Sequence, residues 1–256
     1  MFIRTESFKG FLHFYPLVSI IIAVQIGIWL LTAFVPVIGD WVYYYGLGSN
    51  YLIDQGEYWR LITPIFLHSG VGHIAFNSFA LVIFAPALEQ MLGKLRFLLV
   101  YFFAGIAANI LTYVVEPSPT YVHVGASGAI FGLFGLYLFM VFFEKRLIDP
   151  QNAKLILIIS VISLVMTFLR DNINIAGGHI FGFIGGGFAL GPVLLKNVEP
   201  FSPRKYIRRR KVVDDDIGFD PNRWNKKRYR YKPYLKPIVV GALIILVLLG
   251  LISSFL

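Results

Sequence analysis

Long apolar runs alternate with short polar segments along most of this chain. Each run is about 20 residues long, the length that an α-helix needs to cross the hydrocarbon core of a bilayer. Backbone polar groups in hydrocarbon must be satisfied within the protein, so the runs predict packed helices. We therefore expect an all-α, polytopic transmembrane helical bundle. Seven runs qualify, and they cover approximately residues 16–38, 62–85, 97–115, 122–143, 154–169, 173–195 and 237–256.

The spacing of these runs divides the chain into three parts. Six runs follow one another closely within residues 1–195, which we predict to be one six-helix core. A basic linker, 196–236, separates this core from a seventh transmembrane helix, 237–256. The first run is longer than the about 7–15 apolar residues of a secretory signal, and no clear cleavage site follows it, so we expect a retained membrane anchor.

The composition agrees with a membrane protein. The chain has 256 residues, of which 57% are hydrophobic and 14% are charged, whereas a soluble domain has about 25% charged residues. This composition excludes an ordinary soluble enzyme and a disordered chain. The chain has no cysteine, which excludes disulfides, a thiolate metal site and a cysteine nucleophile. Nothing in the sequence indicates a metal ion or another cofactor.

The net charge of +9 is distributed as membrane topology predicts. If the N-terminus is cytoplasmic, 21 of the 23 Lys and Arg residues lie in cytoplasmic segments, and 14 of them lie in 196–236. We therefore predict a multi-pass protein of the plasma membrane with a cytoplasmic N-terminus and an external C-terminus. The basic linker either serves this topology or also binds anionic lipid headgroups, and we do not expect nucleic acid as a partner.

Four polar side chains stand out within the predicted spans, namely His73, Asn77, Ser127 and His179. Such residues are costly in hydrocarbon and are functional candidates. Ser127 and His179 each lie about six residues into a span that enters from outside, so helical rise would place both about 9 Å below the outer boundary. Glycines at helical spacing on the same two spans predict close packing. Close packing would bring the hydroxyl within hydrogen-bond reach of the imidazole, as an activated serine nucleophile requires.

Three further side chains complete this hypothesis. His73 and Asn77 are one helical turn apart and could hold a developing oxyanion alongside the Ser127 amide. Phe131, one turn after Ser127, could stack on His179 and hold the ring where no acidic residue is available. Each feature also has a structural interpretation, because serine and glycine in spans commonly serve helix packing and a His–Asn pair can be an interhelical hydrogen bond.

In their order along the chain, these residues resemble the motifs of the rhomboid family of intramembrane serine proteases. The resemblance covers approximately residues 16–195. Two positions depart from the usual pattern: Phe131 stands where tyrosine is common, and Gly178 stands where alanine is common. The matching motifs are Trp59-Arg60 in the first outer loop, His68, His73 with Asn77, Gly125-Ala126-Ser127-Gly128, and His179 followed by Gly182 and Gly186.

The resemblance implies a serine–histidine dyad in which Ser127 is the nucleophile and His179 is the general base. It also implies that the Ser127 amide, a neighbouring amide and the side chains of His73 and Asn77 hold the oxyanion. A first outer loop, about 40–60, would lie partly in the membrane, and the seventh helix resembles an addition found in some family members. The expected supporting residues of the oxyanion site are Gly125, Ala126 and Gly128.

The implied activity is endopeptidase cleavage of the transmembrane segments of membrane-protein substrates near their outer ends. Such a site needs a water-filled cavity that opens to the extracytoplasmic side, with His123 as a further candidate for its lining. Substrate helices would enter between the second and fifth helices and unwind before attack. Two alternatives stay open at this point: a catalytically inactive rhomboid-like protein that binds membrane clients, and a small-solute transporter.

Overall fold

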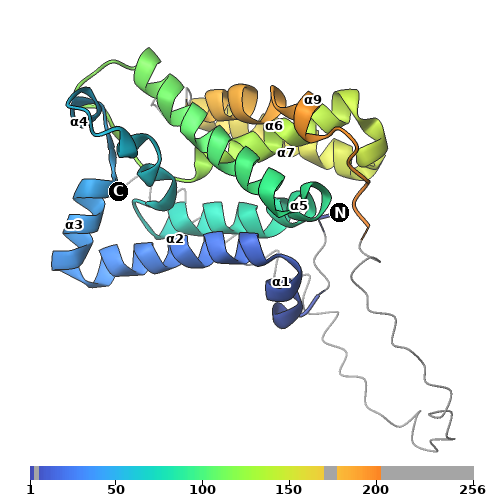
Figure 1. Ribbon diagram of the computed structural model, residues 1–256, viewed down its shortest axis with the longest axis horizontal. Helices are drawn as coiled ribbons and strands as arrows, with labels where there is room; N and C mark the ends of the chain where they lie inside the picture. Colours follow the sequence, from blue (N-terminus) through green and yellow to red (C-terminus); the bar gives the residue numbers. More distant parts are fainter. Residues whose placement is uncertain (3–5, 170–177, 203–256) are drawn as a thin grey trace, which may run out of the picture. The chain divides into compact units, whose positions relative to one another are not determined.

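The computed structural model describes residues 1–2, 6–169 and 178–202 (Figure 1). The chain divides into two compact units, Met1–Phe201 and Ser202–Leu256, and the first is the helical core. The predicted all-α class is confirmed, and within the described part of the chain one two-stranded antiparallel ladder accompanies the helices. The linker from residue 203 and the predicted seventh helix lie outside the described residues. The elements are α1 (Phe8–Phe14), α2 (Pro16–Phe34), α3 (Pro36–Gly46), β1 (Gly48–Ser49), α4 (Asn50–Asp54), η1 (Tyr58–Leu61), η2 (Thr63–Phe66), α5 (Val71–Val115), β2 (Val122–His123), α6 (Ser127–Phe143), η3 (Lys145–Leu147), α7 (Pro150–Leu169), η4 (Gly182–Phe188) and α9 (Gly191–Leu194).

Each of the six runs predicted for the core corresponds to a helical segment. Among the described residues, three helices have the length and composition to cross a membrane, and two shorter apolar helices accompany them. The 45-residue α5 contains two predicted spans, which meet at Gly93 with a φ of 76° and a ψ of 170°. This left-handed φ favours glycine and interrupts the helix there. The long apolar helices are Pro16–Phe34, Val71–Val115 and Pro150–Thr167, and the shorter ones are Ser127–Phe143 and Gly178–Leu194.

Three predicted span boundaries are wrong, each for a local reason. The span 16–38 ends at Phe34, because Pro36 begins α3 and the residue before a proline is disfavoured in helical conformation. The span 62–85 begins as a helix only at Val71, after a 3₁₀ turn. The span 122–143 begins only at Ser127, because the apolar residues before it form β2 and a turn. Apolar composition thus extended these spans past the true helix ends.

A seam of glycines joins α6 to the helix Gly178–Leu194. A Cβ added to Gly182 would lie 2.2 Å from the carbonyl oxygen of Gly128, and one added to Gly187 would lie 1.7 Å from that of Gly132. Side chains cannot occupy these positions without displacing backbone, so the two helices touch through their main chains. The predicted close approach of these spans is confirmed. Part of the second helix, η4, is a π-helical segment.

Buried polar side chains tie the other helices together. The Glu89 carboxylate accepts hydrogen bonds from the Leu17 amide at 3.0 Å and the Val18 amide at 2.9 Å. These amides belong to the first turn of α2, where backbone donors lack intrahelical partners and the helix dipole favours negative charge. Gln25, fully buried on α2, donates to the Tyr101 hydroxyl at 2.9 Å. Glu89 therefore serves the fold.

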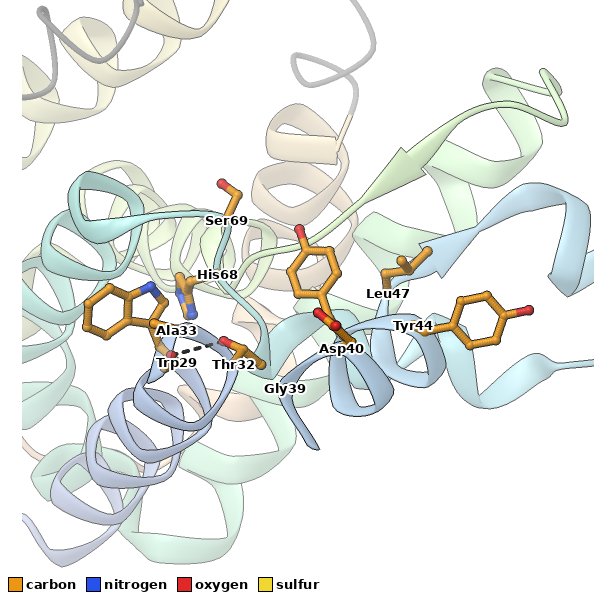
Figure 2. Close-up of a pocket in the computed structure, with 10 residues that line it drawn as sticks. Trp29, Thr32, Ala33, Gly39, Asp40, Tyr44, Leu47, His68 and Ser69 are labelled. Carbon is orange, nitrogen blue, oxygen red and sulfur yellow. Dashed lines mark hydrogen bonds between the residues drawn. The ribbon is translucent and has the colours of Figure 1, made fainter. Parts of the chain in front are cut away.

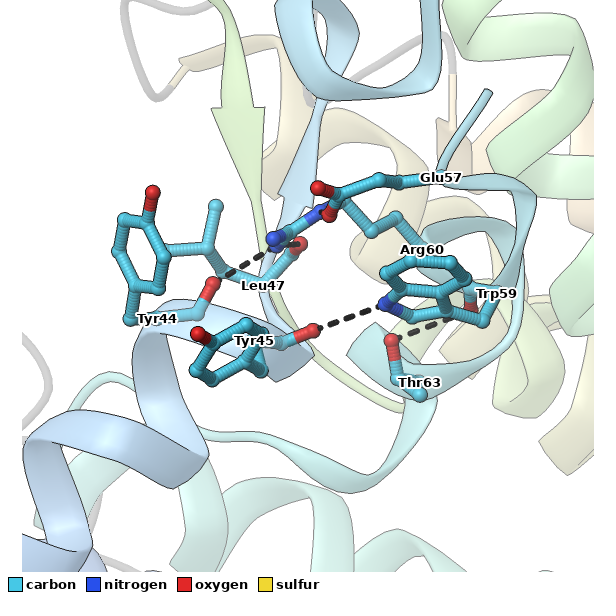
Figure 3. A network of polar contacts seen from close by, with 7 residues as sticks. All are labelled: Tyr44, Tyr45, Leu47, Glu57, Trp59, Arg60 and Thr63. Carbon is cyan, nitrogen blue, oxygen red and sulfur yellow. Dashed lines mark hydrogen bonds and ion pairs between the residues drawn. The ribbon is translucent and has the colours of Figure 1, made fainter. Parts of the chain in front are cut away.

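The outer segment between α2 and α5 is organised around Arg60. Its side chain has no exposed surface and donates to the Tyr44 and Leu47 carbonyls at 2.7 and 2.8 Å and to Glu57 at 2.7 Å (Figure 3). Trp59 donates from its ring to the Tyr45 carbonyl at 3.3 Å. One guanidinium thus joins the end of α3, the residue before β1 and the residue before η1. The Trp-Arg motif therefore has a structural role.

The outer segment is also fastened to the chain that leads into α6. β1 pairs antiparallel with β2, with Gly48 opposite His123 and Ser49 opposite Val122. Asn50 is fully buried and its side chain donates to the carbonyls of Glu116 and Ser118. The turn that precedes Ser127 is therefore held from the side by residues more than 60 positions earlier in the chain.

Candidate active site

Ser127 is the first residue of α6 and is partly buried. The six residues of helix from which its depth was predicted are absent, because an extended segment and a turn lead to this residue, and the depth itself stays a prediction. Gly125 has a φ of 131° and donates its amide to the Pro64 carbonyl at 2.8 Å. The turn therefore places Ser127 at a helix N-terminus, where the first amides lack intrahelical acceptors.

His179 is the second residue of the described helical stretch Gly178–Leu194. Its ring stacks on Phe131, with centroids 4.3 Å apart and planes within 10° of parallel. Its Nδ1 lies 2.9 Å from the Thr167 hydroxyl on α7. Ser127 and His179 thus lie on two helices that touch at Gly128 and Gly182, one and three residues further along the chain.

His73 reaches the same turn from α5. A Cβ added to Gly125 would lie 2.7 Å from the His73 Nε2 and 3.7 Å from the Ser127 hydroxyl oxygen. Gly125 therefore keeps open the space that these two side chains border. The other ring nitrogen of His73, Nδ1, lies 3.1 Å from the Ser69 hydroxyl.

Asn77 lies one turn after His73 and is 7% exposed. Its side-chain amide donates to Nε2 of His68 at 2.9 Å, and the His68 ring lies edge-on to His73 with centroids 5.0 Å apart. Burial, and then the proximity of His73, lower the pKa of His68 to about 3, so this residue is neutral and can accept the hydrogen bond. His68 matched the motif pattern, but its contact with Asn77 could not be read from spacing.

A cavity of about 340 Å³ lies between α2, α3 and the turn before α5 (Figure 2). His68 and Ser69 line it, together with residues of α2 and α3 that include Trp29, Asp40 and Tyr43. Its described lining does not include Ser127 or His179. The cavity therefore borders His68 and Ser69, which contact Asn77 and His73.

His123, a further candidate for the lining, lies on β2 two residues before Gly125. Its ring stacks on Tyr121 with centroids 5.7 Å apart and fills the space beside Gly48. Burial lowers the pKa of His123 to about 4. This histidine therefore packs the ladder between the outer segment and the turn before Ser127.

Comparison with known proteins places these residues in a family. Residues 55–197 match the rhomboid domain, which is more than half of the chain. The chain belongs to the rhomboid family. It is 52% identical over 190 residues to the putative rhomboid protease YdcA of Bacillus subtilis, covering 73% of this chain and 92% of YdcA.

Other rhomboid relatives match a smaller share of their own length. Rhomboid protease GluP of Bacillus subtilis is 42% identical over 160 residues, which are 62% of this chain and 31% of GluP. RHOMBOID-like protein 9, chloroplastic, of Arabidopsis thaliana is 38% identical over 133 residues, which are 50% of this chain and 30% of that protein. These relationships, with the apolar helices, support a membrane-embedded rhomboid protein and an intramembrane protease.

Proposed function

We propose that this protein is an intramembrane serine endopeptidase in which Ser127 is the nucleophile and His179 is the general base. The observation that carries the proposal is the contact of the two helices at Gly128 and Gly182, beside Ser127 and His179, with the His179 ring stacked on Phe131 of α6. Phe131 lies one helical turn after Ser127, so the stacked imidazole lies against the helix that carries the serine. Hydrolases activate a serine hydroxyl with a neighbouring imidazole. Family membership and the curated proteases among the relatives support the same reaction.

The proposed reaction proceeds through an acyl-enzyme. The Ser127 hydroxyl oxygen attacks the scissile carbonyl carbon while His179 Nε2 takes the hydroxyl proton. The imidazolium then gives this proton to the leaving amine as the C–N bond breaks, and the acyl group stays on Ser127 as an ester. Water, deprotonated by His179, attacks the ester and releases the new carboxyl group and the regenerated serine.

The oxyanion of the tetrahedral intermediate needs donors beside the Ser127 oxygen. The Ser127 amide at the start of α6, Nε2–H of His73 and the second N–H of Asn77 are the proposed donors. In this role the Ser69 hydroxyl donates to Nδ1 of His73 and so leaves the proton on Nε2. The amide of Gly125 already donates to Pro64, so the proposed contribution of Gly125, with Ala126 and Gly128, is to shape the turn.

We propose transmembrane segments of membrane proteins as substrates, cut near their outer ends. Entry would take place between the first half of α5 and α7, since α7 presents an apolar, exposed face formed by Ile158, Val161, Ile162 and Val165.

The distribution of Lys and Arg supports a plasma-membrane protein with its N-terminus in the cytoplasm, its C-terminus outside and its site open to the extracytoplasmic side. Binding of anionic lipid by 196–236 is part of this proposal.

Cleavage of a single-span substrate by purified protein tests the proposal. We expect the wild type to cut the substrate, while Ser127→Ala and His179→Ala each reduce the rate at least about 10³-fold. A fluorophosphonate should label the wild type at Ser127 and leave Ser127→Ala unlabelled. Equal cleavage by wild type and Ser127→Ala would contradict the assignment. Binding of the substrate without cleavage by the wild type would favour the inactive, client-binding alternative.

A further inference from the structure

Thr167 is a buried hydroxyl near the C-terminal end of α7, with 6% of its surface exposed. Its oxygen has two neighbours in the structure. One is the Ser163 carbonyl oxygen of the same helix at 2.8 Å, and the other is Nδ1 of His179 at 2.9 Å. A residue of the fifth span therefore contacts the histidine of the sixth span directly.

The protons of this pair can be assigned from the donor inventory. A carbonyl oxygen only accepts, so the single hydroxyl proton of Thr167 is donated to Ser163. The lone pairs of Thr167 then face Nδ1 of His179, and that nitrogen must be the donor. A neutral imidazole carries one proton, so Nε2 is the unprotonated nitrogen. This is the form of histidine that can accept a proton from a serine hydroxyl.

Phe131 and Thr167 constrain the His179 ring in different ways. The stacked Phe131 ring fixes the plane of the imidazole but does not distinguish its two nitrogens. The Thr167 oxygen lies at one nitrogen only and therefore selects the orientation of the ring within that plane. Together the two contacts define where Nε2 points.

A threonine suits this place better than an acidic residue for an energetic reason. An ionised carboxylate is expensive to bury within a membrane-spanning bundle. A hydroxyl that gives its proton to a carbonyl of its own helix presents an acceptor without a formal charge. Such back-bonding to the preceding turn is a common state of threonine in helices.

We propose that Thr167 is a positioning residue that holds His179 in its Nδ1–H tautomer. In other serine hydrolases an acidic residue orients the histidine in this way. The proposal rests on the proposed function of Ser127 and His179. It adds α7 to the active site, because the base depends on an acceptor carried by that helix.

Two variants separate the effect of the Thr167 hydroxyl from the effect of the side-chain volume, and a third serves as a control. Thr167→Val keeps the shape and removes the acceptor, and Thr167→Ser keeps the acceptor and removes a methyl group. Thr32→Val is a matched control, because the Thr32 hydroxyl also donates to a carbonyl of its own helix, that of Trp29 at 2.9 Å. Each purified protein is assayed for kcat and KM with a single-span substrate. Thermal unfolding in detergent shows whether each is folded.

We expect Thr167→Val to lower kcat about 10- to 100-fold at an unchanged KM, the size of effect known for partners that orient a functional histidine. Thr167→Ser should restore kcat to within about threefold of the wild type, and Thr32→Val should match the wild type. Wild-type kcat in Thr167→Val, or an equal loss of kcat in Thr32→Val, would overturn the proposal.

A second readout does not depend on turnover. In Ser127→Ala protein with ¹⁵N-labelled histidine, the ring nitrogen shifts of His179 report the tautomer directly. We expect protonated Nδ1 when Thr167 is present or replaced through Thr167→Ser, and a mixture of tautomers in Thr167→Val. Protonated Nε2 in the protein that retains Thr167 would overturn the inference even if the enzyme is active. Failure of the wild type to cleave, together with protonated Nδ1 in the Ser127→Ala protein, would reject the proposed function and leave the tautomer assignment standing.

Discussion

The glycine seam between α6 and the helix Gly178–Leu194 and the outer segment between α2 and α5 are stabilised in opposite ways. Where α6 meets the helix Gly178–Leu194, the backbones touch because side chains are missing, as the space beside Gly182 and Gly187 shows. In the outer segment, one large side chain, Arg60, fills the centre and satisfies three acceptors while having no exposed surface. We therefore expect side chains added to the seam glycines to destabilise the seam, and loss of the Arg60 donors to destabilise the outer segment.

Adding a side chain to the seam should have the largest effect. In Gly182→Val the new Cβ would meet the Gly128 carbonyl oxygen at 2.2 Å, and backbone cannot yield as a flexible side chain does. We expect a loss of about 3 kcal/mol or more in the free energy of unfolding, with no detectable cleavage. Titration with SDS measures the stability. Gly27→Val is the control, since a Cβ at Gly27 meets nothing within 4 Å, and a similar loss there would refute the contrast.

Removing the donor from the outer segment should have the next largest effect. Arg60→Gln leaves the Tyr44 and Leu47 carbonyls without their charged partner, and Glu57 without its ion pair. We expect a loss of about 2–3 kcal/mol in the free energy of unfolding, measured in the same way. Arg146→Gln removes an arginine that is 52% exposed and paired with Glu144, and should cost about 1 kcal/mol or less. Equal losses would mean that burial of Arg60 carries no special weight.

The smallest effect is expected from pH, through His68 beside the site. Its pKa is lowered to about 3 in the folded protein, against about 6.5 for an unperturbed histidine. Below pH 6.5 the unfolded chain therefore binds a proton at His68 that the folded protein does not. The free energy of unfolding is then unaffected by protonation of His68 above pH 6.5 and decreases as the pH falls toward 3.

We expect His68→Gln to remove about 1–2 kcal/mol of the stability difference between pH 7.5 and pH 5, measured by SDS titration at both values. Glutamine keeps an acceptor for the Asn77 amide, so the pH response is separated from the loss of the hydrogen bond. His13→Gln, on the exposed surface of α1, is the control and should leave that difference unchanged. An unaltered pH response in His68→Gln would show that other groups control acid sensitivity.

The sequence by itself determined the helical class, the six runs of the core and the family, because each depends on residue types at fixed spacing. It also indicated the glycine contact between the fourth and sixth spans, which the structure shows between Gly128 and Gly182. The stack of Phe131 on His179 followed from helical spacing together with that contact. The starting points of two spans did not follow, because apolar residues in β2 and in η2 look the same as apolar residues in a helix.

Tertiary structure alone decided the partners of the polar residues. Thr167 is one of several hydroxyls in the predicted run 154–169, and nothing in its neighbours along the chain marks it as the partner of His179. The hydrogen bonds of Asn77 with His68 and of Asn50 with the Ser118 carbonyl likewise could not be predicted from neighbouring residues. Crossing a membrane is a requirement that each segment meets through its own composition, so sequence determines it. A hydrogen bond requires two distant segments to meet within about 3 Å, and only the packed bundle fixes which ones do.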